Sequence, residues 1–251
     1  MEEINGEFLM KGCSPDDPDR LDTAGQLVSL LSRIGFLPLF SNTIPAFSVE
    51  EHTVAEAWWT GEETDPWEWR MILAEDDSIA YGKFFNKTAG FISKEFFSAF
   101  ANYRRNGYDF DALFEDELAS YKSKKIMDVF ECDDEGNGKE LLSSEIRELA
   151  GKDEAALTDL QMQTYLIVSA FRQRKNKKGQ FYGWHLSAFE TPETKWGRDA
   201  VASSYSEDPS ESWKKIISQM KTHFPEAEDE QIRKLLGIKY PGETVKPKKE
   251  K

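Results

Sequence analysis

The sequence has 251 residues, which is enough for one large domain or two modest ones with a sizeable core. Its 46 acidic and 32 basic residues give a formal net charge of −14, which excludes a uniformly cationic surface for duplex DNA. The aromatic fraction of 13%, with 17 phenylalanines, indicates a globular protein with an aromatic core.

Membrane, disulfide and metal chemistry have little support in the sequence. No apolar run approaches the roughly 20 residues that cross a bilayer, and residues 1–4 lack the basic start of a signal peptide. Two cysteines cannot make a disulfide framework, and three scattered histidines do not suggest a zinc site. No phosphate loop or dinucleotide fingerprint is present. We therefore expect a cytoplasmic protein without membrane contact, metal or cofactor.

The beginning of the chain predicts a polar extension followed by helices. Residues 1–22 are polar and rich in turn formers. A helix is predicted after Asp22 or Thr23, with apolar residues at helical spacing, and Gly35 ends it. Ser48, which is followed by two acidic residues, is the predicted start of a second helix.

The remainder of a predicted N-terminal module, residues 23–131, mixes helices with one strand. Residues 67–74 and 93–103 have helical periodicity, and residues 79–85 have strand character. A further helix is predicted through Leu113 and Leu118. The module is expected to be mostly helical and to resemble a winged helix.

The acidic segment 132–139, which contains two glycines, predicts a linker and a domain boundary. We expect residues 139–240 to form a C-terminal winged helix followed by two terminal helices, the second over 227–236. Residues 241–251 form a lysine-rich tail.

Residues 141–190 carry the pattern of a complete winged helix. A short helix opens at Ser143 or Ser144, a second begins at about Asp153, and two β-rich runs follow over 165–173 and 180–190. Most winged helices bind nucleic acid. The sequence therefore predicts an α+β protein, mostly helical, with winged-helix units that carry a small antiparallel β-hairpin.

A tight basic loop separates the two β-rich runs. At the tip of a hairpin, its five cations would contact the phosphate backbone of DNA. The alternative is a solvated turn whose lysines keep a sheet edge soluble. The five residues are Arg172, Arg174, Lys175, Lys177 and Lys178.

Tryptophans, carboxylates and one arginine are densest over residues 58–70. Aromatic walls would stack on a planar ligand, and Asp65 or Glu68 would act as general base. The alternative is a tryptophan-rich corner of the core beside a solvated acidic loop. The predicted pocket comprises Trp58, Trp59, Trp67, Trp69, Arg70 and, from the following strand, Tyr81.

Two amides, Gln161 and Gln163, lie two residues apart near a predicted helix–strand junction. Amides can pair with base edges or position a water molecule, so both residues are candidates for a catalytic role. The alternative is that they are ordinary polar residues at a junction.

The chain resembles the AlkZ-related proteins, small bacterial relatives of the winged-helix DNA glycosylases of the AlkZ and YcaQ type. The resemblance covers most of residues 24–237. It rests on Gly35-Phe-Leu-Pro-Leu-Phe40, Phe47-Ser-Val-Glu-Glu51, Trp58-Trp-Thr-Gly61, Asp65-Pro-Trp-Glu-Trp-Arg70, Tyr81-Gly-Lys83, Ala89-Gly-Phe-Ile92, Asn102-Tyr-Arg-Arg105, Gly107-Tyr-Asp-Phe-Asp111 and Leu160-Gln-Met-Gln163.

The resemblance implies tandem winged-helix units around a channel and the removal of damaged bases from DNA. Gln161 and Gln163 match the letters of the Gln–apolar–Gln motif that positions water in the glycosylases, although that motif lies nearer the start of those enzymes. The leading hypothesis is thus DNA binding or DNA-lesion processing, with one base flipped between tryptophans while a carboxylate or amide orients water.

Two other hypotheses remain open. The chain could be a non-enzymatic interaction protein whose acidic surface meets a basic protein partner. It could also be a small-molecule-sensing regulator that dimerises through the helix at residues 213–220.

Overall fold

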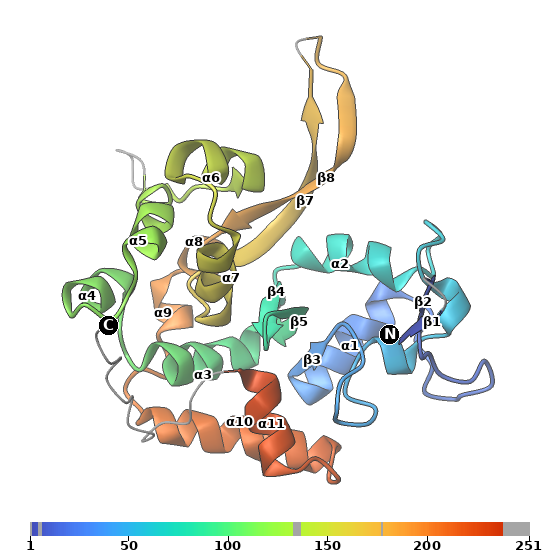
Figure 1. Cartoon of the computed structure of the whole chain (residues 1–251). Helices are drawn as coiled ribbons and strands as arrows, with labels where there is room; N and C mark the ends of the chain where they lie inside the picture. Colours follow the sequence, from blue (N-terminus) through green and yellow to red (C-terminus); the bar gives the residue numbers. More distant parts are fainter. Residues whose placement is uncertain (1, 5–6, 133–136, 177, 238–251) are drawn as a thin grey trace.

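The computed structural model describes residues 2–4, 7–132, 137–176 and 178–237 (Figure 1). The predicted lysine-rich tail and Lys177 lie outside these residues. The fold is mixed helix and strand, which confirms the broad class, while the winged-helix assignment stays a prediction. No described helix combines the length and apolar character that a membrane span requires.

A six-stranded antiparallel sheet forms the centre of the molecule, in the order β3-β5-β4-β7-β8-β6. Strand β4 pairs with β7 through Tyr81 and Val168, so the sheet continues from one side of the expected linker to the other. A separate hairpin, β1 (Glu2–Ile4) with β2 (Glu7–Leu9), lies at the N-terminus. The sheet strands are β3 (Phe36–Pro38), β4 (Ile79–Phe85), β5 (Thr88–Ser93), β6 (Leu141–Leu142), β7 (Ile167–Lys175) and β8 (Phe181–Glu190).

Local signals account for several helices. The side chains of Thr23 and Gln26 form a capping box at the start of α1, and Gly35 ends this helix with a positive φ. Helices α2, α3, α7 and α10 confirm the remaining long periodic segments. Their bounds are α1 (Ala24–Ile34), α2 (Pro66–Ala74), α3 (Lys94–Arg105), α7 (Glu154–Met162) and α10 (Pro209–His223).

Among the shorter helices, α4, α5 and α6 follow one another along one side of the molecule, and α11 lies beside α10 (Figure 1). The helix predicted through Leu113 and Leu118 is interrupted instead, because Glu117 adopts a positive φ between α4 and α5. The short helices are α4 (Phe110–Glu115), α5 (Tyr121–Asp128), α6 (Ser143–Ala150), α8 (Pro192–Trp196), α9 (Arg198–Val201) and α11 (Asp229–Leu236).

The helix predicted from Ser48 is wrong. Two 3₁₀ turns, η1 (Glu50–His52) and η2 (Ala55–Ala57), take its place. The Glu50 carboxylate is fully buried and accepts hydrogen bonds from the backbone N–H groups of Lys11 and Ser41, each at 2.8 Å. The Glu50 backbone N–H itself donates to Leu39. These long-range bonds hold the segment against the sheet and override its local helical preference.

The core is aromatic, as the composition suggests. The centroid of the Phe36 ring lies 4.9 Å from that of Phe100 and 5.9 Å from that of Phe47, and both pairs of rings are arranged edge to face. Phe47 in turn contacts Phe224, which follows α10, at 4.7 Å. The rings therefore join strand β3, helix α3 and the C-terminal helices into one core.

Candidate functional site

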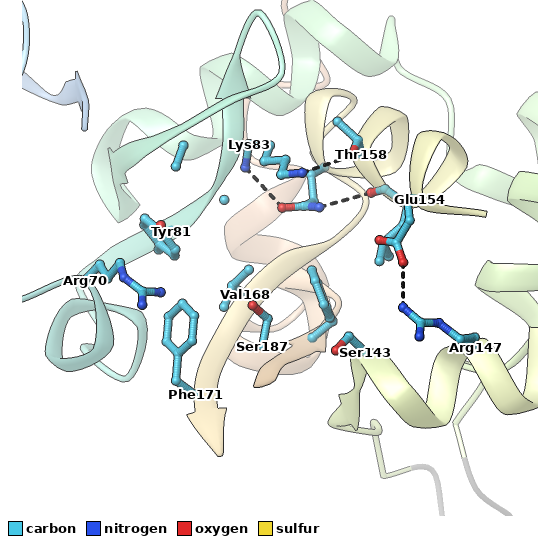
Figure 2. Close-up of a pocket in the computed structure, with 15 residues that line it drawn as sticks. Arg70, Tyr81, Lys83, Ser143, Arg147, Glu154, Thr158, Val168, Phe171 and Ser187 are labelled. Carbon is cyan, nitrogen blue, oxygen red and sulfur yellow. Dashed lines mark hydrogen bonds and ion pairs between the residues drawn. The ribbon is translucent and has the colours of Figure 1, made fainter. Parts of the chain in front are cut away.

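A cavity of about 270 Å³ lies at the base of the β7–β8 hairpin, between the two halves of the chain (Figure 2). Arg70 of α2 and Tyr81 of β4 line one end, and Arg147 of α6 and Glu154 of α7 line the other. The strands β7 and β8 contribute the remaining wall through Val168, Phe171, Ser187 and Phe189. Both sides of the expected linker thus build the cavity.

Arg70 is the most unusual group in the cavity. Its guanidinium carbon lies 3.7 Å from the centre of the Trp67 ring and 4.2 Å from that of Phe171. Burial lowers the pKa of Arg70, and the neighbouring Tyr81 hydroxyl partly offsets this effect. The Arg70 Nε is buried and has no hydrogen-bond partner in the described part of the chain. A desolvated cation with an unused N–H donor is suited to bind an anion or a base edge.

Gln161 also reaches the cavity, but its amide already has partners. Its Oε1 accepts a hydrogen bond from the backbone N–H of Lys83 at 3.1 Å, and its Nε2 donates to the Leu157 carbonyl at 3.2 Å. The Lys83 ammonium lies 3.4 Å from Thr158 Oγ1. Gln163 caps the C-terminus of α7 and does not line the cavity. The amide pair is therefore separated, because α7 ends between its two members.

The far end of the cavity is polar. Arg147 and Glu154 form an ion pair of 2.9 Å, and both side chains are more than half exposed. Ser143, Thr158 and Ser187 add hydroxyl groups to the cavity walls. Arg70, Lys83 and Arg147 carry three positive charges against the single carboxylate of Glu154, so the cavity is locally cationic in an acidic protein.

The predicted tryptophan pocket does not form as one unit. Trp58 and Trp69 lie in the core, where their indole N–H groups donate to Thr53 Oγ1 at 2.9 Å and to the Glu63 carbonyl at 2.7 Å. Trp59 is half exposed, and Trp67 stacks on Arg70. Of the six residues predicted for the pocket, only Arg70 and Tyr81 line the cavity.

The two carboxylates predicted as bases also lie elsewhere. Asp65 is completely buried and accepts hydrogen bonds from the backbone N–H groups of Trp59, Gly61 and Trp67 at 3.1, 2.9 and 2.8 Å. It caps helix α2. Glu68 is half-buried in the first turn of that helix and does not line the cavity. The burial and the hydrogen bonds of Asp65 therefore indicate a structural role for this carboxylate.

The basic loop forms the tip of a long hairpin that projects from the body of the protein (Figure 1). Asn176 Oδ1 closes the turn by accepting from the backbone N–H groups of Lys178 and Gln180, at 2.9 and 3.0 Å. The side chains of Arg174 and Lys178 are exposed. The side chain of Lys175 lies outside the described structure, as does Lys177.

Arg172 differs from Arg174 and Lys178, the other cations of the loop whose side chains the structure describes. Its guanidinium pairs with Glu75 at 2.5 Å and lies 3.8 Å from Glu140. These contacts hold Arg172 at an acidic cluster on the body of the protein. Arg172 is thus less available to phosphate than Arg174 and Lys178.

The chain matches the family model described as "AlkZ related" over residues 21–237. It belongs to the AlkZ-related family. No curated protein and no solved structure matches the chain.

This AlkZ-related protein carries a second group of ionisable residues beside Arg172. Burial, with help from Glu140 and Asp77, raises the pKa of Glu190 to about 7, although Lys195 opposes the shift. The Lys195 ammonium donates to the carbonyls of Ala74 and Ile79 at 2.9 and 3.0 Å. Glu190 is thus an incompletely compensated carboxylate at the junction of the two halves of the chain.

The raised pKa of Glu190 predicts that the free energy of unfolding falls as the pH rises from about 4.5 through 7. The pKa of Glu190 is about 7 in the folded chain against an ordinary value of 4.5, so the folded state retains the proton between these values. The stabilising contribution is fully present below about 4.5 and is lost as the pH passes 7. A Glu190→Gln variant should therefore gain about 1–2 kcal/mol over the wild type between pH 5 and pH 8, after a discount for partial exposure.

Urea unfolding of both proteins at each pH measures this gain. An Asp199→Asn variant, which removes an exposed carboxylate, is the control. A difference between Glu190→Gln and wild type that does not change with pH would contradict the prediction.

Proposed function

We propose that this protein binds DNA through the β7–β8 hairpin and holds one displaced base in the cavity at the base of the hairpin. The local charge of the hairpin is the main support for this proposal. Residues 172–189 contain five lysines and arginines and no carboxylate, in a chain with a net charge of −14. A cationic arm on an acidic body allows only local contact with a polyanion.

The order β6, α6, α7, β7, β8 supports a winged-helix unit in which the hairpin is the wing. The β7–β8 tip would contact the phosphate backbone. We propose Arg174, Lys175, Lys177 and Lys178 as the principal contacts, with Arg172 in a secondary role because of its pairing with Glu75.

The cavity has the features that a single base requires. The rings of Tyr81, Phe171 and Phe189 line the cavity, and the hydroxyl groups and the unpaired Arg70 Nε provide partners for a base edge. Membership of the AlkZ-related family supports a glycosylase-like ancestry. We propose binding and no catalytic step, because only Gln161 of the four predicted catalytic residues reaches the cavity, and its amide is already hydrogen-bonded. The other three are Asp65, Glu68 and Gln163.

Fluorescence anisotropy with labelled DNA tests the hairpin. An Arg174→Glu/Lys178→Glu variant should bind at least about tenfold more weakly at low salt, and the slope of log affinity against log salt should fall by about two. A Lys215→Glu/Lys221→Glu variant carries the same change in charge on α10, far from the hairpin (Figure 1), and should bind like the wild type.

A 2-aminopurine in the same DNA reports on the cavity. Its fluorescence should rise on binding as the base leaves the stack. The Arg70→Met variant should lose most of this rise even at protein concentrations that saturate the DNA, because the substitution affects the cavity and not the hairpin. Wild-type protein that does not bind DNA at low salt, or a hairpin variant that binds equally well, would refute the proposal.

A further inference from the structure

The outer half of β8 exposes three aromatic side chains that the charge pattern alone does not explain. Phe181, Tyr182 and Trp184 are 62%, 49% and 91% exposed, and Trp184 is the most exposed of the large hydrophobic residues in the described structure. All three belong to the first four residues of β8, a strand of the hairpin that projects from the body of the protein (Figure 1). A group of solvent-exposed aromatic side chains on a projecting element is typical of a binding site.

The backbone of the hairpin is built to present Trp184. Arg172 pairs with Leu186 and Arg174 pairs with Tyr182, so one residue of β7, Gln173, faces three residues of β8. Within this bulge Gly183 adopts a φ of 75°, and its carbonyl accepts a hydrogen bond from Gln173 Nε2 at 3.1 Å. A bulge of this kind redirects a side chain from the regular pleat. The exposure of Trp184 is therefore fixed by the fold of the strand.

Cations accompany these rings. Arg174 lies opposite Tyr182 in the strand register, and Lys175 lies opposite Phe181. The absence of carboxylates over residues 172–189 favours a polyanionic partner, and the rings favour one that also offers flat apolar faces. Nucleic acid with unpaired bases has both properties.

We infer that residues 181–184, with their flanking cations, stack on unpaired bases, so that the protein prefers single-stranded or gapped DNA to an intact duplex. In a duplex the base faces are stacked on one another and the grooves expose only base edges. An unpaired base exposes its face to an indole or phenol ring, whatever the sequence. This inference rests on the proposed binding of DNA and adds the state of the DNA that is recognised.

The test compares three DNAs of one sequence: a single strand, a duplex with a gap, and an intact duplex. Wild-type protein should bind the first two about tenfold more tightly than the third, by anisotropy at two salt concentrations. Trp184→Ala should remove most of this preference and leave duplex affinity within about twofold. Because Trp184 is 91% exposed, the variant should unfold at the wild-type temperature.

Tyr121→Ala is the matched control. Tyr121 is 68% exposed and has the Lys125 ammonium 5.1 Å from its ring centre, but it lies on α5, outside the hairpin. This variant should retain the full preference. Equal affinity of the wild type for the three DNAs, or an equal loss for all three in Trp184→Ala, would overturn the inference while the proposed function stands. Binding to none of them, as expected of a hairpin that docks on an acidic protein, would overturn both.

Discussion

Replacing Arg105 with methionine is expected to lower the free energy of unfolding by about 2–4 kcal/mol, because it removes a buried cation that donates to several groups, among them the partly exposed carboxylate of Glu193. Arg105 is 4% exposed and forms an ion pair with Glu193 of α8. It also donates to Thr164 Oγ1 at 3.3 Å and to the Tyr205 hydroxyl at 3.1 Å, and its guanidinium lies 4.4 Å from the centre of the Tyr165 ring. Methionine fills part of the space but leaves these acceptors without their donor.

A strained residue adds to this expectation. Thr164 is β-branched and adopts a φ of 65°, a conformation that such residues rarely tolerate. Both its hydroxyl and its carbonyl accept hydrogen bonds from Arg105. Because Thr164 connects α7 to the segment that enters β7, the loss of Arg105 should disturb the same elements that form the cavity.

Urea unfolding monitored by circular dichroism measures the effect. Lys87→Met is the matched control, since the Lys87–Asp159 ion pair has side chains that are 60% and 51% exposed and should contribute less than about 1 kcal/mol. A similarly small effect for Arg105→Met would show that the buried pair is not a principal link between α3 and the C-terminal half.

The parts of the fold that could be predicted from sequence are those with local causes. Thr23 and Gly35 bound α1 because capping and a left-handed backbone are properties of a few adjacent residues. The Asn176 turn similarly follows from a side chain that bonds its own backbone. The helix predicted after Ser48 does not form because its causes are not local: the Glu50 carboxylate accepts hydrogen bonds from backbone groups up to 39 residues away.

The candidate site could be predicted only in part, for the same reason. The sequence predicts Arg70 from an aromatic cluster and Tyr81 from the following strand, but the cluster does not reveal which of its members face the core. Helix α2 places Trp69 inside and Arg70 against Phe171, which is 101 residues later in the chain. Arg147 and Glu154 carried no motif that marks a cavity.

The sequence does not predict the exposed rings of β8, because a run of aromatic residues in a strand ordinarily indicates burial. A usable signal was nevertheless present in Phe181-Tyr-Gly-Trp184. Aromatic residues stand at both odd and even positions there, with a glycine between them. A strand with one buried face would place its aromatic residues at every second position, so this pattern indicates an irregular strand.

Replacing Asp65 with alanine is expected to cost about 2–4 kcal/mol of stability and so to separate a structural role from a catalytic one. The variant loses the cap of α2 and leaves the N–H groups of Trp59 and Gly61 without an acceptor inside the protein. Trp59 itself has a φ of 61°, so its strained turn depends on the same carboxylate. Asp65→Asn keeps one acceptor oxygen and should show roughly half the loss.

Asp208→Ala provides the comparison, because Asp208 is an exposed cap that accepts from the N–H of Ser210 at the start of α10, and its loss should cost about 1 kcal/mol or less. Thermal and urea unfolding rank the three variants. A catalytic carboxylate would behave differently, since Asp65→Asn would then unfold like the wild type while any base release from modified DNA disappeared. With three backbone donors on one completely buried carboxylate, we expect stability to change instead.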